Sequence, residues 1–414
     1  MNDLFISSTG QKGKAEHDQY VKELEEKLEQ TEKELHLTKE RVNELMLDDR
    51  KLNSRQILNM ASEKKFNGGI LDFIKEVVKN KNQHDFNYRT ALSLAARVYM
   101  NEKDDFKNMV YSHASKGMKI EEIPEFMIRA GLTDNPMPLR QAASFRGSLN
   151  MRVRQKQLVE PLPEWLLDDK KLAYQFMKQL DVKTPAISDE TYRLEEIPQK
   201  NGVVIKPVDG AGGRGVYLVY STNDIIDIKR SQHLNNWNDL LTNMKNDVFM
   251  GWVSHNEWFM EKLILENEQE KTPASDIKFY CFYSKVGLIL EINRVPKPSY
   301  CWWTVTGERV RTGKYDEDLF KGKGVTQSEI DLASSISLKI PAPFIRIDFL
   351  RSQDGLVFGE FTPKPGNYDE FDEPTDKWIG DYFLEAQGNL INDLLDGKEF
   401  NEYKQLAASI TNSQ

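Results

Sequence analysis

Short apolar runs rich in β-branched and aromatic residues follow one another from residue 161 onward, and they constrain the fold more than any other feature of the chain. The runs are VVIKPV, GVYLVY, DVFMGWV, IKFYCFY, GLILEINRV, FIRIDFL and LVFGEF. Several neighbouring runs are separated only by turn residues, and such neighbours pair as antiparallel strands rather than as repeated strand–helix–strand units. Helical patterns alternate with them. We therefore predict an α+β fold with antiparallel or mixed sheets from this point of the chain.

The chain before residue 161 shows helical patterns and no clear strand. Residues 18–47 carry a heptad repeat among glutamates and lysines. Its two rows are Val21, Leu28, Leu35 and Val42, and Leu24, Thr31, Thr38 and Leu45. The repeat favours a coiled coil at residues 1–50, after a flexible start, and hence a homo-oligomer, either a dimer or a trimer; a single solvated helix is the alternative. Residues 51–160 are predicted to form a helical N-terminal region.

The composition excludes several classes of protein. Hydrophobic residues make up 39% and charged residues 29% of the 414 residues, as in a globular chain with a sizeable core. We expect no secretory signal and no membrane span, because no basic start precedes an apolar run and no stretch of about 18 apolar residues occurs. Cys281 and Cys301 are too few for a disulfide framework and are not spaced as metal ligands. A net charge of −9 argues against broad nucleic-acid binding, and we expect a cytoplasmic protein.

The segment GVVIKPVDGAGGRGVYLVY joins two predicted strands through a glycine-rich loop. Lys206 lies near the end of the first strand, and the loop spans residues 209–215. Glycines allow backbone N–H groups to approach a polyphosphate without a clash with a Cβ atom, and the lysine adds a positive charge. The loop leads into a strand and not into a helix, so it is neither a Walker loop nor a Rossmann turn. It is either a phosphate-binding hairpin of another kind or simply a turn.

A second predicted hairpin, FIRIDFLRSQDGLVFGEFTPKPG, carries charged residues on strands that are otherwise apolar. Strand alternation places Arg346 and Asp348 on one face, and Glu360 on the returning strand can lie opposite them. Facing carboxylates bind hard cations through oxygen, and a neighbouring arginine suits a phosphate bridged by such cations. An ion pair on a strand surface is the alternative. The apolar neighbours favour a buried sheet, in which an unpaired acid would be costly.

These two hairpins, in this order, resemble those of the ATP-grasp enzymes, and more narrowly of the TupA-like branch, which is linked to teichuronopeptide and other surface-polysaccharide synthesis. The resemblance covers about residues 160–395. It implies two α+β subdomains that clasp ATP, a central one at 161–260 and a C-terminal one with the metal site at 261–395, followed by a tail at 396–414. It also implies the use of ATP and Mg²⁺ in a carboxylate–amine ligase that acts through an acyl phosphate.

The resemblance implies a role for each matching residue. The residues implied to bind the nucleotide, through phosphate contacts, the glycine-rich loop and an adenine hinge, are Lys170, Lys206, Gly210, Gly212, Gly213, Gly215, Glu261, Lys262, Leu263 and Glu266. The implied metal ligands are Asp348, Glu360 and Thr362, the last at a position where many ATP-grasp enzymes have asparagine. The implied catalytic residues are Arg346, Lys278 in the D-x-K-F-x-x-F strand, and Lys364 near the reacting acyl group.

Three functions are compatible with this set of residues. The first is a ligase that attaches an amino acid or another amine to a carboxylated glycan or small acid in surface-polysaccharide biosynthesis. The second is an ATP-grasp kinase that phosphorylates a sugar or another hydroxyl, because both reactions use the same phosphate and metal ligands. The third is a non-enzymatic coiled-coil scaffold with a vestigial nucleotide domain. The joint presence of the lysines, the arginine and the two carboxylates argues against the scaffold.

Two further segments have open interpretations. Trp302 and Trp303 either flank a sugar or acidic acceptor, together with nearby cations, or pack inside the fold. The segment SFRGSLNMRVRQKQ either grips an acidic substrate or forms a solvated helix face paired with acids. Its cations are Arg146, Arg152, Arg154 and Lys156.

Overall fold

The computed structural model describes residues 54–130, 139–159, 161–187, 190–209 and 212–411, with single positions between 22 and 36. The chain divides into two compact units, Met1–Met137 and Pro138–Gln414, and each is described by itself. Both rows of the heptad repeat lie outside the described residues, so the coiled coil stays a prediction. Among the described helices, none is both long and apolar enough to cross a membrane.

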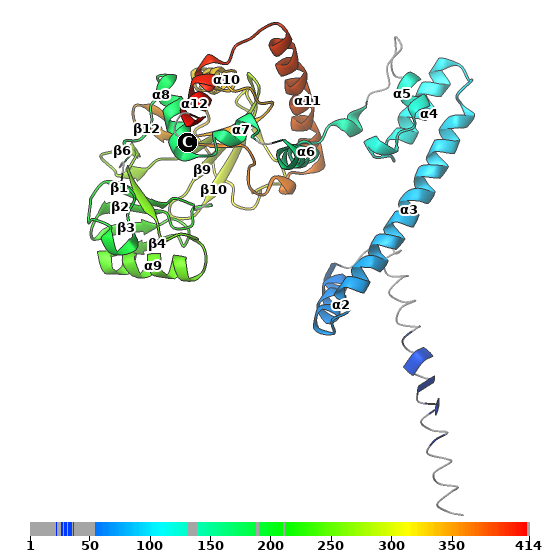
Figure 1. Cartoon of the computed structure of the whole chain (residues 1–414), viewed down its shortest axis with the longest axis horizontal. Coiled ribbons are helices and arrows are strands. Elements are labelled where there is room, and N and C mark those ends of the chain that lie inside the picture. The colour runs from blue at the N-terminus through cyan, green and yellow to red at the C-terminus, as the bar shows by residue number, and fades with distance from the viewer. Residues whose placement is uncertain are drawn as a thin grey trace, which may run out of the picture. The chain divides into compact units, whose positions relative to one another are not determined.

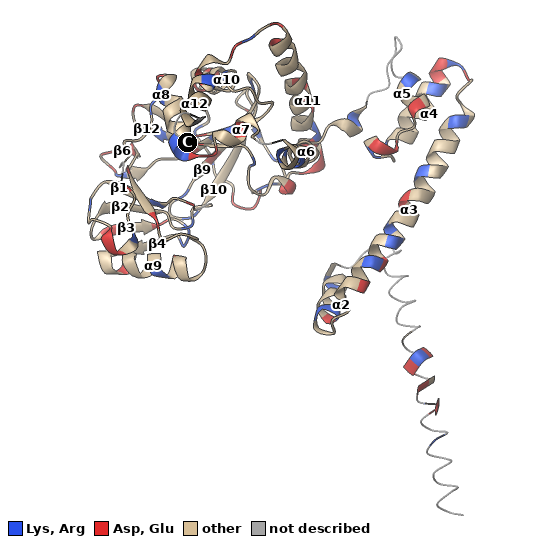
Figure 2. Ribbon diagram, in the orientation of Figure 1, with Lys and Arg blue, Asp and Glu red and all other residues tan. Residues whose placement is uncertain are grey.

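The first unit contains helices, which confirms the predicted helical N-terminal region (Figure 1). They are α2 (Ser54–Phe66), α3 (Ile70–Val98), α4 (Asp104–Ser115), the 3-10 turn η1 (Ile120–Glu122) and α5 (Glu125–Ala130). Its core is small and centres on Tyr111 of α4 and Met127 of α5. Basic and acidic residues are both distributed along α3, which buries only Ala96 (Figure 2).

The second unit combines two large sheets, with helices on their faces, and a short two-stranded sheet of β6 and β7 (Figure 1). The helices are η2 (Arg140–Ala142), α6 (Phe145–Leu158), α7 (Pro163–Leu166), α8 (Lys170–Gln179), η3 (Leu194–Glu196), α9 (Trp237–Phe249), α10 (Gln327–Ser337), η4 (Tyr368–Glu370), α11 (Glu373–Leu395) and α12 (Asn401–Thr411). The strands are β1 (Val203–Pro207), β2 (Tyr217–Ser221), β3 (Asp224–Asp227), β4 (Gln232–Leu234), β5 (Trp258–Lys262), β6 (Leu265–Asn267), β7 (Thr272–Pro273), β8 (Asp276–Phe282), β9 (Lys285–Asn293), β10 (Ser299–Trp303), β11 (Arg309–Val310), β12 (Ile345–Ser352) and β13 (Gly355–Thr362).

The first sheet has the strand order β4-β3-β2-β1-β5, and all its neighbours are antiparallel. The glycine-rich segment forms the β1–β2 hairpin, in which Ile205 pairs with Tyr217. Helix α9 begins at the N-cap Asn236, whose side chain accepts the N–H of Asp239, and it buries Leu240 and other apolar residues against this sheet. The opposite face of the sheet lines the site described below.

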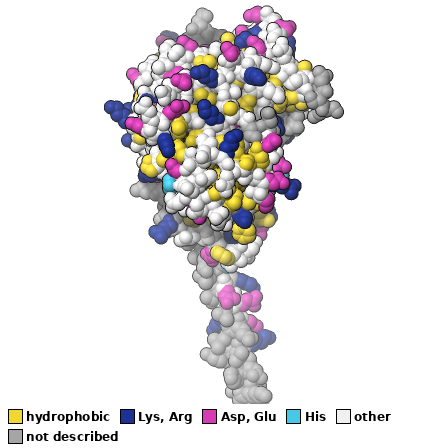
Figure 3. Space-filling view, turned by 90° about the vertical axis from the view of Figure 1, so that its left-hand side faces the viewer, with side chains coloured by type: hydrophobic (Ala, Val, Ile, Leu, Met, Phe, Trp, Pro, Cys, Tyr) yellow, Lys and Arg dark blue, Asp and Glu magenta, His cyan; other side chains and the backbone are white. Residues whose placement is uncertain are grey.

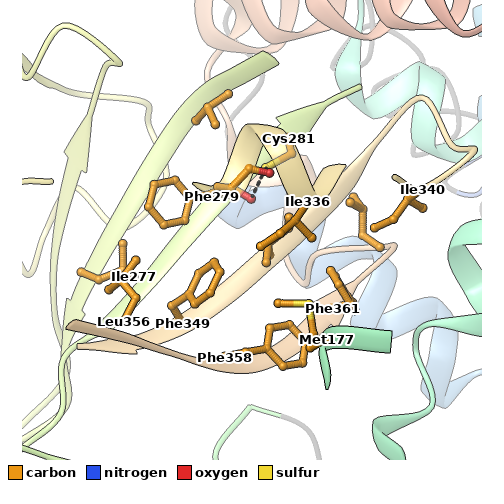
Figure 4. Packing of buried hydrophobic residues seen from close by; sticks show 14 of the residues in the cluster. Met177, Ile277, Phe279, Cys281, Ile336, Ile340, Phe349, Leu356, Phe358 and Phe361 are labelled. Atoms are coloured by element: carbon orange, nitrogen blue, oxygen red, sulfur yellow. Dashed lines mark hydrogen bonds between the residues drawn. The ribbon is translucent and has the colours of Figure 1, made fainter. Parts of the chain in front are cut away.

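The second sheet has the order β11-β10-β9-β8-β12-β13 and is also antiparallel. Strand β8 is buried on both faces, because alternate residues enter different layers. Phe279 points into a core shared with α8, α10 and α12 (Figure 4), and Phe282 packs with α6 and α11. The expected fold class, α+β with antiparallel sheets, is confirmed.

The observed divisions of the chain differ in detail from the expected ones. Helix α6, expected in the helical N-terminal region, belongs to the second unit, where Phe145 is fully buried beside α11. Residue 261, expected to begin the C-terminal subdomain, lies inside β5 of the first sheet. The expected tail includes α12, whose Leu406 is buried in the core of the second sheet. Each difference depends on packing between segments far apart in the chain.

Candidate active site

A cleft of about 1510 Å³ in the second unit is lined by residues from both sheets and from the start of α8. The predicted site residues that line it are Lys170, Lys206, Gly212, Gly213, Glu261, Leu263, Lys278, Arg346, Asp348, Glu360, Thr362 and Lys364. Gly215, Lys262 and Glu266 are not among its lining residues, and Gly210 lies outside the described residues. Segments separated by almost 200 positions in the sequence thus meet in one cleft.

Lys206 and Glu261 form an ion pair in the part of the cleft that we call the nucleotide half, between the first sheet and α8. Their strands, β1 and β5, are neighbours in the sheet. The hydroxyl of Tyr174 lies 2.8 Å from the Glu261 carboxylate and 3.2 Å from the Gly359 carbonyl. Burial, followed by the charge of Glu261, raises the pKa of Tyr174, so the hydroxyl stays a neutral donor.

Lys170 is the first residue of α8, directly after the N-cap Asp169. The Asp169 side chain accepts the N–H of Leu172 at 3.0 Å and starts the helix at this point. The Lys170 ammonium lies 5.2 Å from the ring centroid of Phe259. Burial, followed by the charge of Lys206, lowers the pKa of Lys170. Two lysines near each other in a partly dehydrated cleft form a site that favours a polyanion.

The glycine-rich loop adopts backbone conformations that favour glycine. Gly212 and Gly213 have φ angles of +65° and +77°, and both line the cleft. Gly215 has a φ of +68°, and a Cβ atom there would lie 3.1 Å from Pro207 and from Trp258. Gly215 therefore closes the hairpin onto the sheet, whereas the two preceding glycines face the site.

The predicted adenine hinge begins in the last residues of β5, and its backbone is already engaged by the fold. The N–H of Lys262 donates to the Ala186 carbonyl at 2.8 Å, and the N–H of Leu263 donates to the Gly202 carbonyl at 2.9 Å. The side chain of Lys262 is exposed and points away from the cleft lining, whereas Leu263 and Ile264 line the cleft. Ile264, the last residue of the segment that resembles the hinge, thus belongs to the cleft wall.

Glu266 and Lys364 differ in their relation to the cleft. The Glu266 carboxylate accepts a hydrogen bond from Ser275 at 2.7 Å and forms an ion pair with Lys323. Because Glu266 does not line the cleft, the structure does not bring it to the other nucleotide residues. Lys364 lines the cleft and is solvent-exposed, so its ammonium remains hydrated.

Asp348 is the buried anion of the second sheet. Its carboxylate accepts two hydrogen bonds from Arg346, each 2.6 Å long, and forms an ion pair with Lys278, its register partner on β8. Burial by itself raises the pKa of Asp348, but the charges of Arg346 and Lys278 outweigh burial and lower the pKa to about 2. Asp348 is therefore ionised at every physiological pH.

Glu360 is the register partner of Asp348 on β13, and Arg346 lies 3.9 Å from the Glu360 carboxylate. The hydroxyl of Thr362 accepts a hydrogen bond from Arg346 at 2.9 Å. Asp168, which sequence reasoning missed, also lines the cleft; burial, followed by the charge of Glu360, raises its pKa. Among the described residues, no group of three or more His, Cys, Asp or Glu is arranged to hold a metal. Two carboxylates and a hydroxyl fit Mg²⁺ that arrives with a nucleotide, since Mg²⁺ usually keeps water and phosphate oxygens in its shell.

A second group of residues missed by sequence reasoning lines the cleft beyond Arg346. Lys314 lies in the loop after β11 and is fully buried, and its ammonium donates to the Gly366 carbonyl. Tyr300 and Tyr315 stack with ring centroids 4.2 Å apart and an interplanar angle of 16°. Tyr300 lies in β10, beside the tryptophans for which an acceptor role was one interpretation, whereas Lys314 and Tyr315 lie in a loop without a periodic pattern. We call this part of the cleft the acceptor half.

Trp302 and Trp303 are packing residues and not exposed platforms. Both side chains are buried in the second sheet. The indole N–H of Trp302 donates to the Lys314 carbonyl at 2.8 Å, and that of Trp303 donates to Glu291 at 3.0 Å. Of the two open interpretations, the structure supports packing.

The cations of α6 are engaged by the fold around them. Arg152 forms a salt bridge with the buried Glu164 at 2.6 Å, and the Lys156 ammonium lies 4.1 Å from the ring centroid of Trp165. Neither Arg152 nor Lys156 lines the cleft. The structure therefore supports pairing within the fold for this segment.

Comparison with family models agrees with the architecture. The family model described as TupA-like ATPgrasp matches residues 147–384, more than half of the chain. Similar solved structures include D-alanine–D-alanine ligase from Bacillus anthracis, with 16% identity over 55% of this chain and 70% of that chain and a TM-score of 0.33. Another is the ATP-grasp ligase PsnB complexed with its minimal precursor, Mg and ADP, with 10% identity over 58% and 67% of the chains and a TM-score of 0.30. Comparison with curated proteins gives no match.

Proposed function

Because the chain belongs to the TupA-like ATP-grasp family and is thereby an ATP-dependent ligase, we propose that it joins a carboxylate to an amine through an acyl phosphate. The acid is a carboxylated glycan or small acid, and the amine is an amino acid or a related amine, in surface-polysaccharide biosynthesis. The observation that supports this proposal is the single cleft that combines two lysines, paired carboxylates and an arginine. The N-terminal heptad repeat, as a coiled coil, makes the protein a homo-oligomer.

The nucleotide half binds ATP. Lys170 and Lys206 attract the phosphates, and burial of both ammonium groups strengthens that attraction relative to water. The backbone at Gly212 and Gly213 approaches the phosphates without side chains in the way. Leu263 supplies an apolar wall for the base.

The predicted metal ligands Asp348, Glu360 and Thr362 would hold Mg²⁺, which in this chemistry neutralises charge on the phosphates. Without a bound cation, Arg346 and Lys278 neutralise Asp348. If Asp348 binds Mg²⁺ instead, Arg346 and Lys278 would be available to contact the phosphoryl group that is transferred. Donors that are already positioned in a dehydrated site stabilise developing charge at little reorganisation cost.

The proposed reaction has two balanced steps. A carboxylate oxygen of the acid attacks the γ-phosphorus of ATP, the bond from that phosphorus to the bridging oxygen breaks, and ADP leaves. The amine nitrogen then attacks the acyl carbon, inorganic phosphate leaves, and the nitrogen loses a proton. Neither step needs a protein nucleophile, so positioning and charge neutralisation are the main tasks of the side chains.

Hydroxylamine trapping tests this proposal directly, because hydroxylamine captures an acyl phosphate as a stable hydroxamate. The purified protein is incubated with ATP, Mg²⁺, hydroxylamine and a panel of sugar acids and amino acids. We expect hydroxamate and ADP in equal amounts with at least one acid, and loss of both in Glu360→Gln. ADP formed together with a phosphoester, and without hydroxamate, would identify a kinase instead. ATP turnover that Glu360→Gln leaves unchanged would contradict catalysis at this site.

A further inference from the structure

Lys314 is a buried cation in the wall of the acceptor half. It is 1% exposed, and its ammonium donates to the Gly366 carbonyl and lies 5.0 Å and 5.2 Å from the ring centroids of Tyr315 and Phe371. Within the described part of the chain, no Asp or Glu oxygen lies within 4.0 Å of this ammonium. Lys314 therefore lacks the counterion that buried lysines usually have.

This arrangement is costly for the folded protein. A lysine ammonium has three N–H donors, and the structure provides one hydrogen-bond acceptor for Lys314 among the described residues. Burial, followed by the charge of Arg346, lowers the pKa of Lys314 to about 7. A methionine would fill the same space without the cost of dehydrating a charge. Titratable groups held in such unfavourable surroundings are concentrated at functional sites.

The neighbouring cations of the cleft already have acidic partners. Arg294 donates to Asp276 at 2.8 Å, and Lys278 and Arg346 both pair with Asp348. Figure 3 shows an outer face of the molecule, where exposed lysines and arginines lie singly among acidic and hydrophobic side chains. In the acceptor half, the uncompensated buried charge is thus that of Lys314, and an anionic ligand is what would balance it.

The ring of Tyr315 lies next to this charge and stacks on that of Tyr300. Tyr300 and Tyr315 both line the cleft, and their stacked rings form an aromatic surface in its wall. A ligand that places a carboxylate near Lys314 would contact this surface with the rest of its body. A carboxylate attached to a ring or a short chain, as in a sugar acid, fits both features.

We propose that Lys314 binds the carboxylate of the acid substrate and that Tyr300 and Tyr315 contact the remainder of that substrate. The proposal rests on the function proposed above and identifies the residues that hold one of its two substrates. Lys314, Arg346 and Lys278 line the same cleft, so a carboxylate bound at Lys314 shares that cleft with the residues assigned to phosphoryl transfer. The Lys314 ammonium also neutralises the charge of the acid substrate while this substrate approaches the negatively charged nucleotide.

Calorimetric titration of the full chain tests this assignment. Wild type, Lys314→Met and the control Lys339→Met are first saturated with Mg²⁺ and ADP, and then titrated with D-glucuronate, D-galacturonate and L-glutamate. Lys339 lies outside the cleft and pairs with Glu402, so it matches the chemical change without touching the site. We expect at least one acid to bind wild type and Lys339→Met, and to bind Lys314→Met at least about tenfold more weakly. Binding of Mg²⁺ and ADP should be equal in all three proteins.

A second variant separates charge from tethering. Lys314→Gln keeps a donor for the Gly366 carbonyl but has no charge. Loss of acid binding in this variant supports the assignment, whereas retained binding in either variant overturns it. Absence of acid binding to a wild-type protein that binds Mg²⁺ and ADP also overturns it, and leaves ATP use intact. Failure of wild type to bind Mg²⁺ and ADP would contradict the proposed function itself, and this assignment with it.

Discussion

Arg346 holds Asp348 through two parallel hydrogen bonds, from Nε to Oδ1 and from Nη2 to Oδ2, each 2.6 Å long. The two residues lie two positions apart on β12, so their side chains share the face that lines the cleft. Lys278 on the adjacent strand adds a second cation to the same carboxylate. The charge balance of this buried centre therefore depends on Asp348.

Replacement of Asp348 by Asn leaves Arg346 and Lys278 without their shared counterion. Removal of one partner from a buried ion pair typically costs about 3–5 kcal/mol, and we expect a loss of this size in the free energy of unfolding, measured with urea. ATP turnover should fall by at least about 10²-fold. Asp354→Asn, at an exposed turn of the same hairpin, is the control and should change neither quantity. An unchanged unfolding midpoint for Asp348→Asn would contradict the described ion pairs.

The same carboxylate gives the stability a defined dependence on pH. The pKa of Asp348 is lowered from 3.8 to about 2 in the folded state. A lowered acid pKa contributes stability above the unfolded value of about 4, and this contribution is lost as the pH falls toward 2. We expect the difference in free energy of unfolding between wild type and Asp348→Asn to shrink by on the order of 2 kcal/mol between about pH 5 and pH 2. A difference that is constant over this range would count against the assignment.

Gly213 of the glycine-rich loop can be compared with Gly202, which directly precedes β1. Gly213 and Gly202 have φ angles of +77° and +68°, but only Gly213 lines the cleft. Alanine at either position should lower the stability by about 1 kcal/mol, because both positions disfavour a Cβ atom. We expect Gly213→Ala alone to raise the KM for ATP. An equal effect of both variants on this KM would show that strain, and not phosphate approach, is responsible.

Tyr174 tests the role of the Glu261 carboxylate. Tyr174→Phe removes the hydroxyl that lies 2.8 Å from Glu261, which should cost about 1 kcal/mol of stability and raise the KM for ATP. Tyr403→Phe is the control, because its hydroxyl bonds the Pro163 carbonyl away from the cleft. Thermal melts and ATP kinetics on both variants separate the two effects. If the two substitutions change the KM for ATP equally, ATP does not bind in the part of the cleft that we call the nucleotide half.

Because Lys314 loses its proton near neutral pH, we predict that binding of the acid substrate weakens as the pH rises. Its pKa of about 7 is lowered by burial and by the charges of Arg346 and Lys278, whereas Glu370 and Asp369 favour its protonated form. Because only the protonated lysine attracts a carboxylate, the affinity for the acid should fall as the pH increases through 7. Since the unfolded value of 10.5 is higher, the folded state releases this proton first, and the contribution of Lys314 to stability rises as the pH increases from about 7 to 10.5. Titrations at a series of pH values should show this fall in wild type and not in Lys314→Met.

Features that depend on neighbours in the chain could be predicted from the sequence. Strand alternation placed Arg346, Asp348 and Glu360 on one face, and the structure has them on paired strands that line the cleft. The lysine before the glycine-rich loop was likewise assigned to a strand end, where Lys206 lies. Both predictions succeed because the period of a strand and the turn between two strands are local properties.

Features that depend on contacts between distant segments were decided by the tertiary structure. Glu266 turns to Ser275 and Lys323 because the short β6–β7 pair directs it away from the cleft. Gly215 serves the packing of Trp258, 43 positions further along the chain. Lys314 lies in a loop without periodicity, and it lines the cleft because the chain around Gly366 packs onto it. Burial and charge balance arise from which side chains meet in space, and residues far apart in the sequence meet only when the two sheets are assembled.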